Sequence, residues 1–331
     1  MMASRPSRDR QTRTKPAART LRYVLYAVLA AGVGALVHMG ANLALLANVP
    51  EATKSLSGLT LVPGGSLVIC GGGKMPDPVR ARFVELAGGP SARILVIPTA
   101  HAYADGPGVI RAIEAWNGQK VEWIRLLHTR SRQQADDPDF VRPLTEATGV
   151  WIGGGRQEML ADAYLGTEVE RQLMALLARG GVIGGTSAGA AIMSRMMIVS
   201  GRTEAKLGQG FDFLPGVVVD QHFLKRNRIK RLLGVVRSHP DLIGLGIDEQ
   251  TALVVDIRGK RLHVIGNSYV VACVPESSPP KAGEASLVST PTPGPTTARL
   301  EILKPGDEAD LSTLRSLANG GVMPGIDLEA L

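Results

Sequence analysis

The sequence is poor in aromatic residues and in cysteine. Only 4% of its 331 residues are aromatic, which disfavours an aromatic-rich binding surface, and Cys70 and Cys273 are its two cysteines. Two cysteines cannot form a metal cluster by themselves, and their flanks, SLVIC and VVAC, are typical of buried strands. We therefore expect inert core thiols, with a disulfide as the alternative. The sequence has no internal repeat, and its 44% hydrophobic and 20% charged residues exclude a chain that is disordered throughout.

The main part of the chain also lacks an excess of positive charge, although the formal net charge is +7. Residues 1–22 hold seven basic residues and one acidic residue, a net charge of +6. The other 309 residues hold 30 basic and 29 acidic residues, a net charge of +1. Because a nucleic-acid-binding domain carries its positive charge on the folded body, we expect no nucleic acid among the partners.

The N-terminal region indicates an attachment to a membrane. After the basic residues 1–22, residues 23–47 form a run of 25 residues without formal charge, long enough for a transmembrane helix. By the positive-inside rule the basic segment stays in the cytoplasm, so the body that follows the linker 48–65 is expected outside it, periplasmic or extracellular. A cleaved signal peptide with secretion is one alternative, and a buried helix is another. No clean Ala-x-Ala cleavage site is present.

The body of the chain, residues 66–275, has the alternating pattern of an α/β domain. Helical patterns over about 76–88, 107–117, 138–147 and 157–179 separate short apolar runs, which predict strands at 66–70, 93–98, 121–127, 149–152 and 181–184. Such strands predict a doubly wound, mostly parallel sheet covered on both faces. Closely spaced strands over 243–274 predict an antiparallel extension. Residues 276–331 begin with a Pro/Ser/Thr-rich segment, and the last thirty residues are expected to be peripheral.

The sharpest local signal is the segment GGVIGGTSAGAAIMS, in which an apolar strand runs into Gly185, Ser187 and Gly189 with the spacing G-x-S-x-G. A nucleophile at a sharp strand-to-helix turn needs a strained backbone, and its neighbours two residues away need to be nearly without side chains. The N-terminus of the following helix directs N–H groups at a developing oxyanion. The motif predicts a nucleophilic Ser187. The alternative is a glycine-rich turn that only packs a helix onto a sheet.

A serine nucleophile needs a base, and His222 is the best candidate among the six histidines. It follows the apolar strand GVVVD at the edge where α/β sheets bind their ligands, and a structural polar histidine is the alternative. A carboxylate should orient its imidazole, and GLGIDEQTALVV supplies Asp248 and Glu249. Neighbours in an extended segment point to opposite sides, so only one of them faces the site. The residues alone leave the choice open.

Three segments, GGTSAGAAIMS, LPGVVVDQHFLKRNRIKRLL and GLGIDEQTAL, resemble cyanophycinase and its relatives in this order and spacing. The segments ARILVIPTA and VWIGGGRQ are similar too, so the resemblance covers roughly residues 64–275. It implies a serine exopeptidase on a flavodoxin-like, class I glutamine amidotransferase-like fold. It further implies Ser187 as nucleophile, His222 as general base and Glu249 as the orienting acid. The backbone N–H groups of Gly154 and Ala188 would then form the oxyanion hole.

The same resemblance implies a set of substrate-binding residues, one directly after the glycine-rich turn of VWIGGGRQ and the others in the segment DQHFLKRNRIKR: Gln157, Asp220, Gln221, Arg226, Arg228 and Arg231. Without the resemblance, the basic segment would be a solvated helix face. Two positions depart from the family, since His101 stands where a small hydroxyl residue is usual and Lys74 where an acidic one is common.

Together these observations predict a serine exopeptidase that hydrolyses aspartyl peptides or a cyanophycin-like polymer, a polymer of β-Asp-Arg units. No metal or organic cofactor is expected, and a homodimer is possible. An Asp-specific dipeptidase of the same fold and a membrane-tethered, non-catalytic binding protein are the alternatives. Glutamine amidotransferase chemistry is disfavoured because residue 187 is not cysteine. A phosphate-binding loop at residues 71–73 is a weak hypothesis, because the spacing of neither nucleotide fingerprint is present.

Overall fold

The computed structural model describes residues 64–276 and 297–317. The basic segment 1–22, the expected membrane segment 23–47 and most of the linker 48–65 lie outside the described residues. Within 64–276 and 297–317, no helix is both long and apolar enough to cross a membrane. The membrane anchor therefore stays a prediction.

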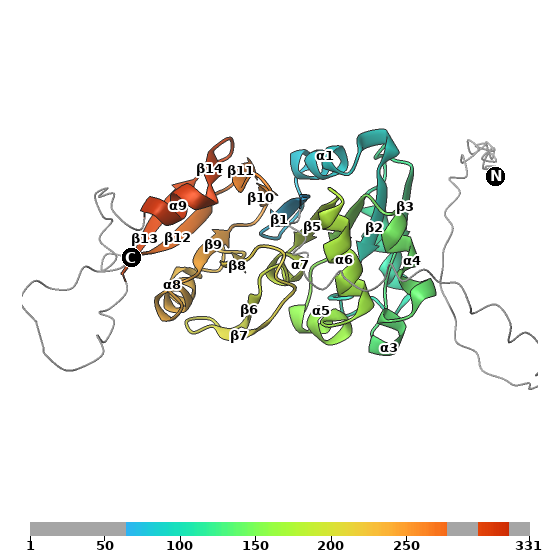
Figure 1. The fold of residues 1–331 in the computed structure, drawn as a ribbon, viewed down its shortest axis with the longest axis horizontal. Helices are drawn as coiled ribbons and strands as arrows, with labels where there is room; N and C mark the ends of the chain where they lie inside the picture. Colours follow the sequence, from blue (N-terminus) through green and yellow to red (C-terminus); the bar gives the residue numbers. More distant parts are fainter. Residues whose placement is uncertain (1–63, 277–296, 318–331) are drawn as a thin grey trace, which may run out of the picture.

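The largest element is an eight-stranded sheet with the strand order β14-β11-β10-β1-β5-β4-β2-β3 (Figure 1). Its parallel strands are β1 (Ser66–Cys70), β5 (Val182–Thr186), β4 (Gly149–Ile152), β2 (Arg93–Ile97) and β3 (Trp123–Leu126). Beyond β1 the sheet continues with the antiparallel strands β10 (Thr251–Asp256), β11 (Arg261–Gly266) and β14 (Glu308–Asp310). The prediction of an α/β fold is confirmed.

Both faces of this sheet are covered, which explains why its parallel strands are apolar along their length. In β1, Leu67 lies in one buried cluster and its neighbour Val68 in another, because successive side chains point to opposite faces. The Leu67 face packs against α4 (Pro138–Glu146), α5 (Gln157–Tyr164) and α6 (Glu168–Ala178). The Val68 face packs against α1 (Asp77–Leu86), whose Phe83 contacts the ring of Trp151.

The helices differ from the sequence pattern at two places. The pattern over 157–179 predicts one helix, but the structure has α5 and α6, separated by a turn in which Gly166 has a φ of 72°. The pattern over 107–117 predicts one helix, but the structure has a 3-10 turn followed by a short α-helix. The periodicity of apolar residues does not distinguish these two kinds of turn. The remaining short elements around the first sheet are η1 (Gly89–Ser91), η2 (Pro107–Ile110), α2 (Arg111–Glu114) and α3 (Arg132–Ala135).

A second sheet lies beside the first, with α8 (Ile229–Ser238) packed on it (Figure 1). Its strands in order are β13 (Thr297–Leu303), β12 (Val270–Glu276), β9 (Ile243–Ile247) and β8 (Val217–Gln221), of which β8 and β9 are parallel. The expected single extension over 243–274 is therefore divided between two sheets, since β10 and β11 join the first and β9 and β12 join the second. The alternation of apolar residues predicts a strand, but it does not indicate which of the two sheets that strand joins.

The C-terminal part that the structure describes supplies an edge strand to each sheet. β13 pairs with β12, β14 pairs with β11, and α9 (Leu311–Leu317) follows. The boundary at residue 275 stays a prediction. A two-stranded ribbon, β6 (Met196–Ser200) and β7 (Lys206–Gln209), contacts β8 of the second sheet.

Candidate active site

Ser187 occupies the turn between β5 and the short helix α7 (Ala188–Ala191) with a strained backbone, φ 52° and ψ −109°. Gly185 and Gly189, on either side of Ser187, have no room for a side chain. A Cβ on Gly185 would overlap the carbonyl oxygen of Gly189, and a Cβ on Gly189 would overlap that of Ile152. The Ser187 N–H donates to the carbonyl oxygen of Cys70 over 3.1 Å, which ties the turn to the end of β1. This is the geometry that the G-x-S-x-G spacing predicts.

Three residues from different strand ends form a hydrogen-bonded relay. The hydroxyl oxygen of Ser187 lies 2.9 Å from Nε2 of His222, and Nδ1 of His222 lies 2.6 Å from Oε1 of Glu249. His222 follows β8 and has a φ of 49°, while Glu249 lies in the turn where the chain passes from β9 in the second sheet to β10 in the first. The relay therefore lies at the junction of the two sheets.

The glycine run at residues 71–73 supports this relay, a role that the sequence alone did not reveal. The carbonyl oxygen of Gly71 accepts the His222 N–H over 2.7 Å, and a Cβ on Gly72 would overlap the imidazole ring. A Cβ on Gly73 would lie 3.2 Å from the Cβ of Glu249. Three glycines directly after a buried strand were a usable signal, because such a run allows another residue to approach the backbone closely.

Burial lowers the pKa of His222 below its ordinary value, because a buried site disfavours the imidazolium. The hydrogen bond to Glu249 acts in the opposite direction and raises the pKa, while the charge of Arg226 lowers it. The net result favours neutral imidazole near pH 7, the form that accepts a proton from a serine.

Two backbone segments that the sequence predicts for an oxyanion hole lie close to Ser187. Ala188 begins α7, so its N–H precedes the first intrahelical hydrogen bond. Gly154, in the turn after β4, is so close that a Cβ there would lie 3.4 Å from the Cβ of Ser187. The backbones of Gly154 and Ala188 are therefore the candidates for an oxyanion site.

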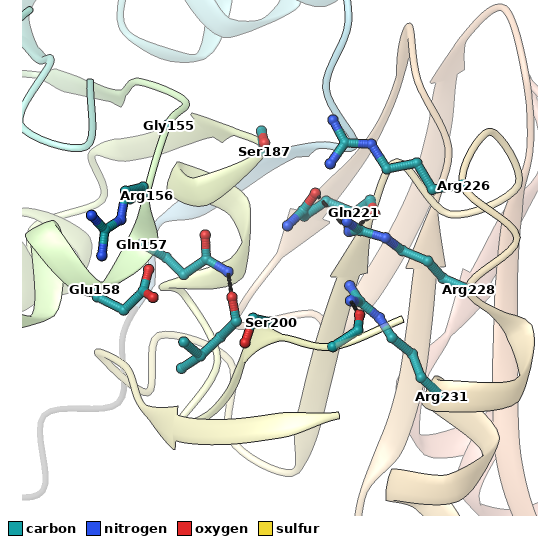
Figure 2. Close-up of a pocket in the computed structure, with 12 residues that line it drawn as sticks. Gly155, Arg156, Gln157, Glu158, Ser187, Ser200, Gln221, Arg226, Arg228 and Arg231 are labelled. Carbon is teal, nitrogen blue, oxygen red and sulfur yellow. Dashed lines mark hydrogen bonds between the residues drawn. The ribbon is translucent and has the colours of Figure 1, made fainter. Parts of the chain in front are cut away.

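A cavity of about 330 Å³ opens beside Ser187. Figure 2 shows the side chains of Arg226, Arg228 and Arg231 on one wall and those of Gln157 and Glu158 on the other. Apart from these five residues, the lining comprises Gly155, Arg156, Ser187, Val199, Ser200, Gly201 and Gln221. The volume is at the small end of the range for ligand sites, and the arginines give it a positive wall that suits an anionic group.

The three arginines of this wall differ in what they contact. Arg231, 3% exposed, donates from Nε and Nη2 to the two carboxylate oxygens of Asp220, over 2.7 and 2.5 Å. Arg228 donates from Nη1 to Asp220 over 3.3 Å and to the carbonyl and side-chain oxygens of Gln221. Burial lowers the pKa of Arg228 to about 10, so it stays protonated at neutral pH. The guanidinium of Arg226 is exposed and has no hydrogen bond or ion pair to any residue within 64–276 or 297–317.

Two further residues singled out in the sequence, Gln157 and Asp248, form hydrogen bonds that hold parts of the fold together. Gln157 is buried and donates from Nε2 to the carbonyl oxygens of Ile198 and Val199, which joins α5 to β6. Asp248 points away from His222 and accepts hydrogen bonds from the Lys225 N–H and the Ser268 hydroxyl. Of the two neighbouring acids, Glu249 is therefore the one that faces the imidazole.

The fold and this relay define a serine-type peptidase. The chain belongs to peptidase family S51, whose family model matches residues 67–265. It is 34% identical over 224 residues to a cyanophycinase of Synechococcus elongatus, covering 64% of this chain and 68% of the relative. It is 35% identical over 242 residues to a cyanophycinase of a Nostoc species, covering 68% and 76%.

A solved structure has the same fold. The crystal structure of a peptidase from an acI-B1 Actinobacterium aligns with a TM-score of 0.56 at 22% sequence identity. The alignment covers 76% of this chain and 98% of that one. At this identity the likeness concerns the fold alone.

Proposed function

We propose that this serine-type peptidase is a serine exopeptidase of cyanophycinase type, which cleaves aspartyl peptides with Ser187, His222 and Glu249 as its catalytic triad. The observation that carries the proposal is the continuous relay from the Ser187 hydroxyl through His222 to Glu249, with distances of 2.9 and 2.6 Å. His222 removes the hydroxyl proton as the serine oxygen attacks the carbonyl carbon, and it returns that proton to the leaving amine. Water then attacks the acyl-enzyme with the same base, which releases the acid and frees Ser187.

The remaining roles follow from position. Glu249 holds the imidazole in the tautomer with a proton on Nδ1 and stabilises the imidazolium that forms. The N–H groups of Gly154 and Ala188 stabilise the negative charge on the tetrahedral oxygen. Because every functional group is a side chain or backbone N–H of this chain, the proposed chemistry requires no metal and no organic cofactor.

The positive wall of the cavity supports a substrate with a free carboxylate near the scissile bond. Arg226 carries an exposed guanidinium for a two-point contact, and Arg228 and Gln221 add donors beside it. A β-linked aspartyl residue keeps a free α-carboxylate on Cα, so the carboxylate and the scissile carbonyl belong to the same residue. The relatives are named cyanophycinases, so a β-Asp-Arg polymer is the first substrate to test.

The test is to incubate the full chain with cyanophycin and with matched α- and β-aspartyl peptides, and to identify the products by mass. We expect release of small dipeptides from the polymer, with no products from the Ser187→Ala protein. Cleavage of aspartyl dipeptides without attack on the polymer would favour the dipeptidase alternative. Binding without turnover would favour the non-catalytic binding protein.

The location of the enzyme is a separate part of the proposal. The +6 charge of residues 1–22 before the uncharged run 23–47 supports an anchor with the catalytic domain outside the cytoplasm. A reporter fused after Leu331 that is active only across the membrane should then give a signal. A cytoplasmic signal would reverse this part of the proposal and leave the chemistry unchanged.

A further inference from the structure

A second hydrogen-bonded cluster, outside the triad, supports the turn at residues 153–156, which contains Gly154 and is called the oxyanion turn below. This turn is attached to the last residue of β2 and to the segment that follows it. The Gly153 N–H donates to the carbonyl oxygen of Ile97, and the Arg156 N–H donates to that of Ala100, both over 2.9 Å. A Cβ on Gly155 would overlap the same Ala100 oxygen. The position of the Gly154 N–H is therefore set by residues 97–100.

Arg130 in turn holds that segment through the backbone carbonyl groups of the residues directly before and after Ala100. It donates from Nη1 to the carbonyl oxygen of Thr99 over 2.8 Å and from Nη2 to that of His101 over 3.0 Å. Its Nε donates to Asp105 over 2.7 Å, which closes the loop that begins at His101. One planar guanidinium thus holds three acceptors in a fixed arrangement, which a lysine ammonium cannot reproduce.

The side chain of Thr99 connects the segment around Ala100 to helix α5. Its hydroxyl oxygen, fully buried, lies 2.8 Å from Nδ1 of His128 and 2.7 Å from the hydroxyl of Tyr164, the last residue of α5. His128 also contacts Asp105 through Nε2 over 2.9 Å. The helix that starts directly after the oxyanion turn is therefore held at its far end by the cluster that supports the turn.

We propose that Arg130 is a positioning residue for catalysis, which holds the turn at residues 98–101 beneath Gly154 and thereby fixes the oxyanion site. This inference rests on the role proposed above for the Gly154 N–H. The hydrogen bonds of Arg130 go to Thr99, His101 and Asp105, none of which lines the cavity, so its replacement should change the rate of the chemical step and leave substrate binding nearly unchanged. Displacement of a catalytic group by about 1 Å can cost about a hundredfold in rate.

The experiment compares Arg130→Lys with the parent in the full chain. The concentration of active sites is first titrated with a fluorophosphonate, so that a loss of folded protein does not count as a loss of rate. We expect kcat per active site on an aspartyl peptide to fall between about ten- and a hundredfold, with KM within about twofold of the parent. The rate of reaction of Ser187 with the fluorophosphonate should fall in parallel, because that reaction also builds negative charge on an oxygen beside Gly154.

Arg125→Lys is the matched control. The two arginine side chains have similar exposure, 34% for Arg125 and 32% for Arg130, but Arg125 contacts Glu146 and the ring of Trp123, away from the oxyanion turn. Its kcat should equal that of the parent. If Arg130→Lys does not fold, Asp105→Asn, which weakens the same cluster at an exposed carboxylate, should show a smaller loss of kcat in the same direction.

A kcat per active site within twofold of the parent would overturn the proposal, and so would a rise in KM that accounts for the whole loss. A parent enzyme that labels at Ser187 but cleaves no peptide would refute the proposed substrate, and the labelling rate of Arg130→Lys would still decide the role of Arg130. A parent whose Ser187 does not label would refute the proposed function and this inference together.

Discussion

Replacement of Asp220 by Asn should destabilise the folded protein more than it weakens substrate binding. The carboxylate is fully buried, with two hydrogen bonds from Arg231 and one from Arg228. Asparagine keeps the shape of the side chain but removes the negative charge, which leaves the buried guanidinium of Arg231 without its counter-charge. Removal of one partner from a buried ion pair costs about 3–5 kcal/mol.

Thermal unfolding of the full chain measures this cost. For a folded body of 150–250 residues each kcal/mol shifts Tm by about 2–4 °C, so Asp220→Asn should lower Tm by about 6–20 °C. Arg226→Gln is the control, because its guanidinium is exposed, and its Tm should stay within about 2 °C of the parent. If Asp220→Asn melts with the parent and raises KM instead, Asp220 binds substrate directly and this reasoning is wrong.

Three further predictions concern the site. Burial lowers the pKa of His222, so the acid limb of kcat/KM should lie below about pH 6.5, and the free energy of unfolding should fall as pH drops through that value, because the unfolded chain binds the proton more readily. An acid limb above pH 7 would contradict the assignment of the base. Glu249→Gln should lower kcat by up to about four decades, whereas Asp248→Asn should mainly lower Tm. The reverse order in a kinetic comparison would exchange their roles. Arg226→Lys should lower kcat/KM for a carboxylate-bearing substrate by roughly tenfold, because a charge-assisted two-point contact is lost. Equal turnover by the lysine variant would exclude that contact.

The parts of the fold and site that depend on local sequence were predictable. Each parallel strand of the first sheet lies within two residues of its expected position, because a buried strand needs a continuous apolar run. The strained strand-to-helix turn at Ser187 was predictable because the constraints on such a turn fall on glycines two residues away, and its role as the nucleophile stays a prediction. The buried state of Cys70 and Cys273, which are free thiols, also followed from their apolar flanks.

The parts that depend on which distant segments meet were not predictable. Asp248 and Glu249 could not be told apart from the residues alone, because the choice depends on the chain leaving one sheet for the other at that turn. Arg231 had the sequence of an exposed basic helix face, yet it is buried, because α8 packs on the second sheet and Arg231 pairs there with Asp220 of β8, 11 residues away. The contacts of Arg130 lie about 30 residues away in sequence and left no local signal.

The most direct test of the catalytic triad is to locate a fluorophosphonate adduct by mass spectrometry. The relay predicts one adduct, on Ser187, which is absent from Ser187→Ala and forms at least about a hundredfold more slowly in a folded His222→Ala protein, because the base is missing. An adduct on another residue, or a Ser187→Ala protein that hydrolyses aspartyl peptides at the rate of the parent, would contradict the assignment of Ser187 as the nucleophile.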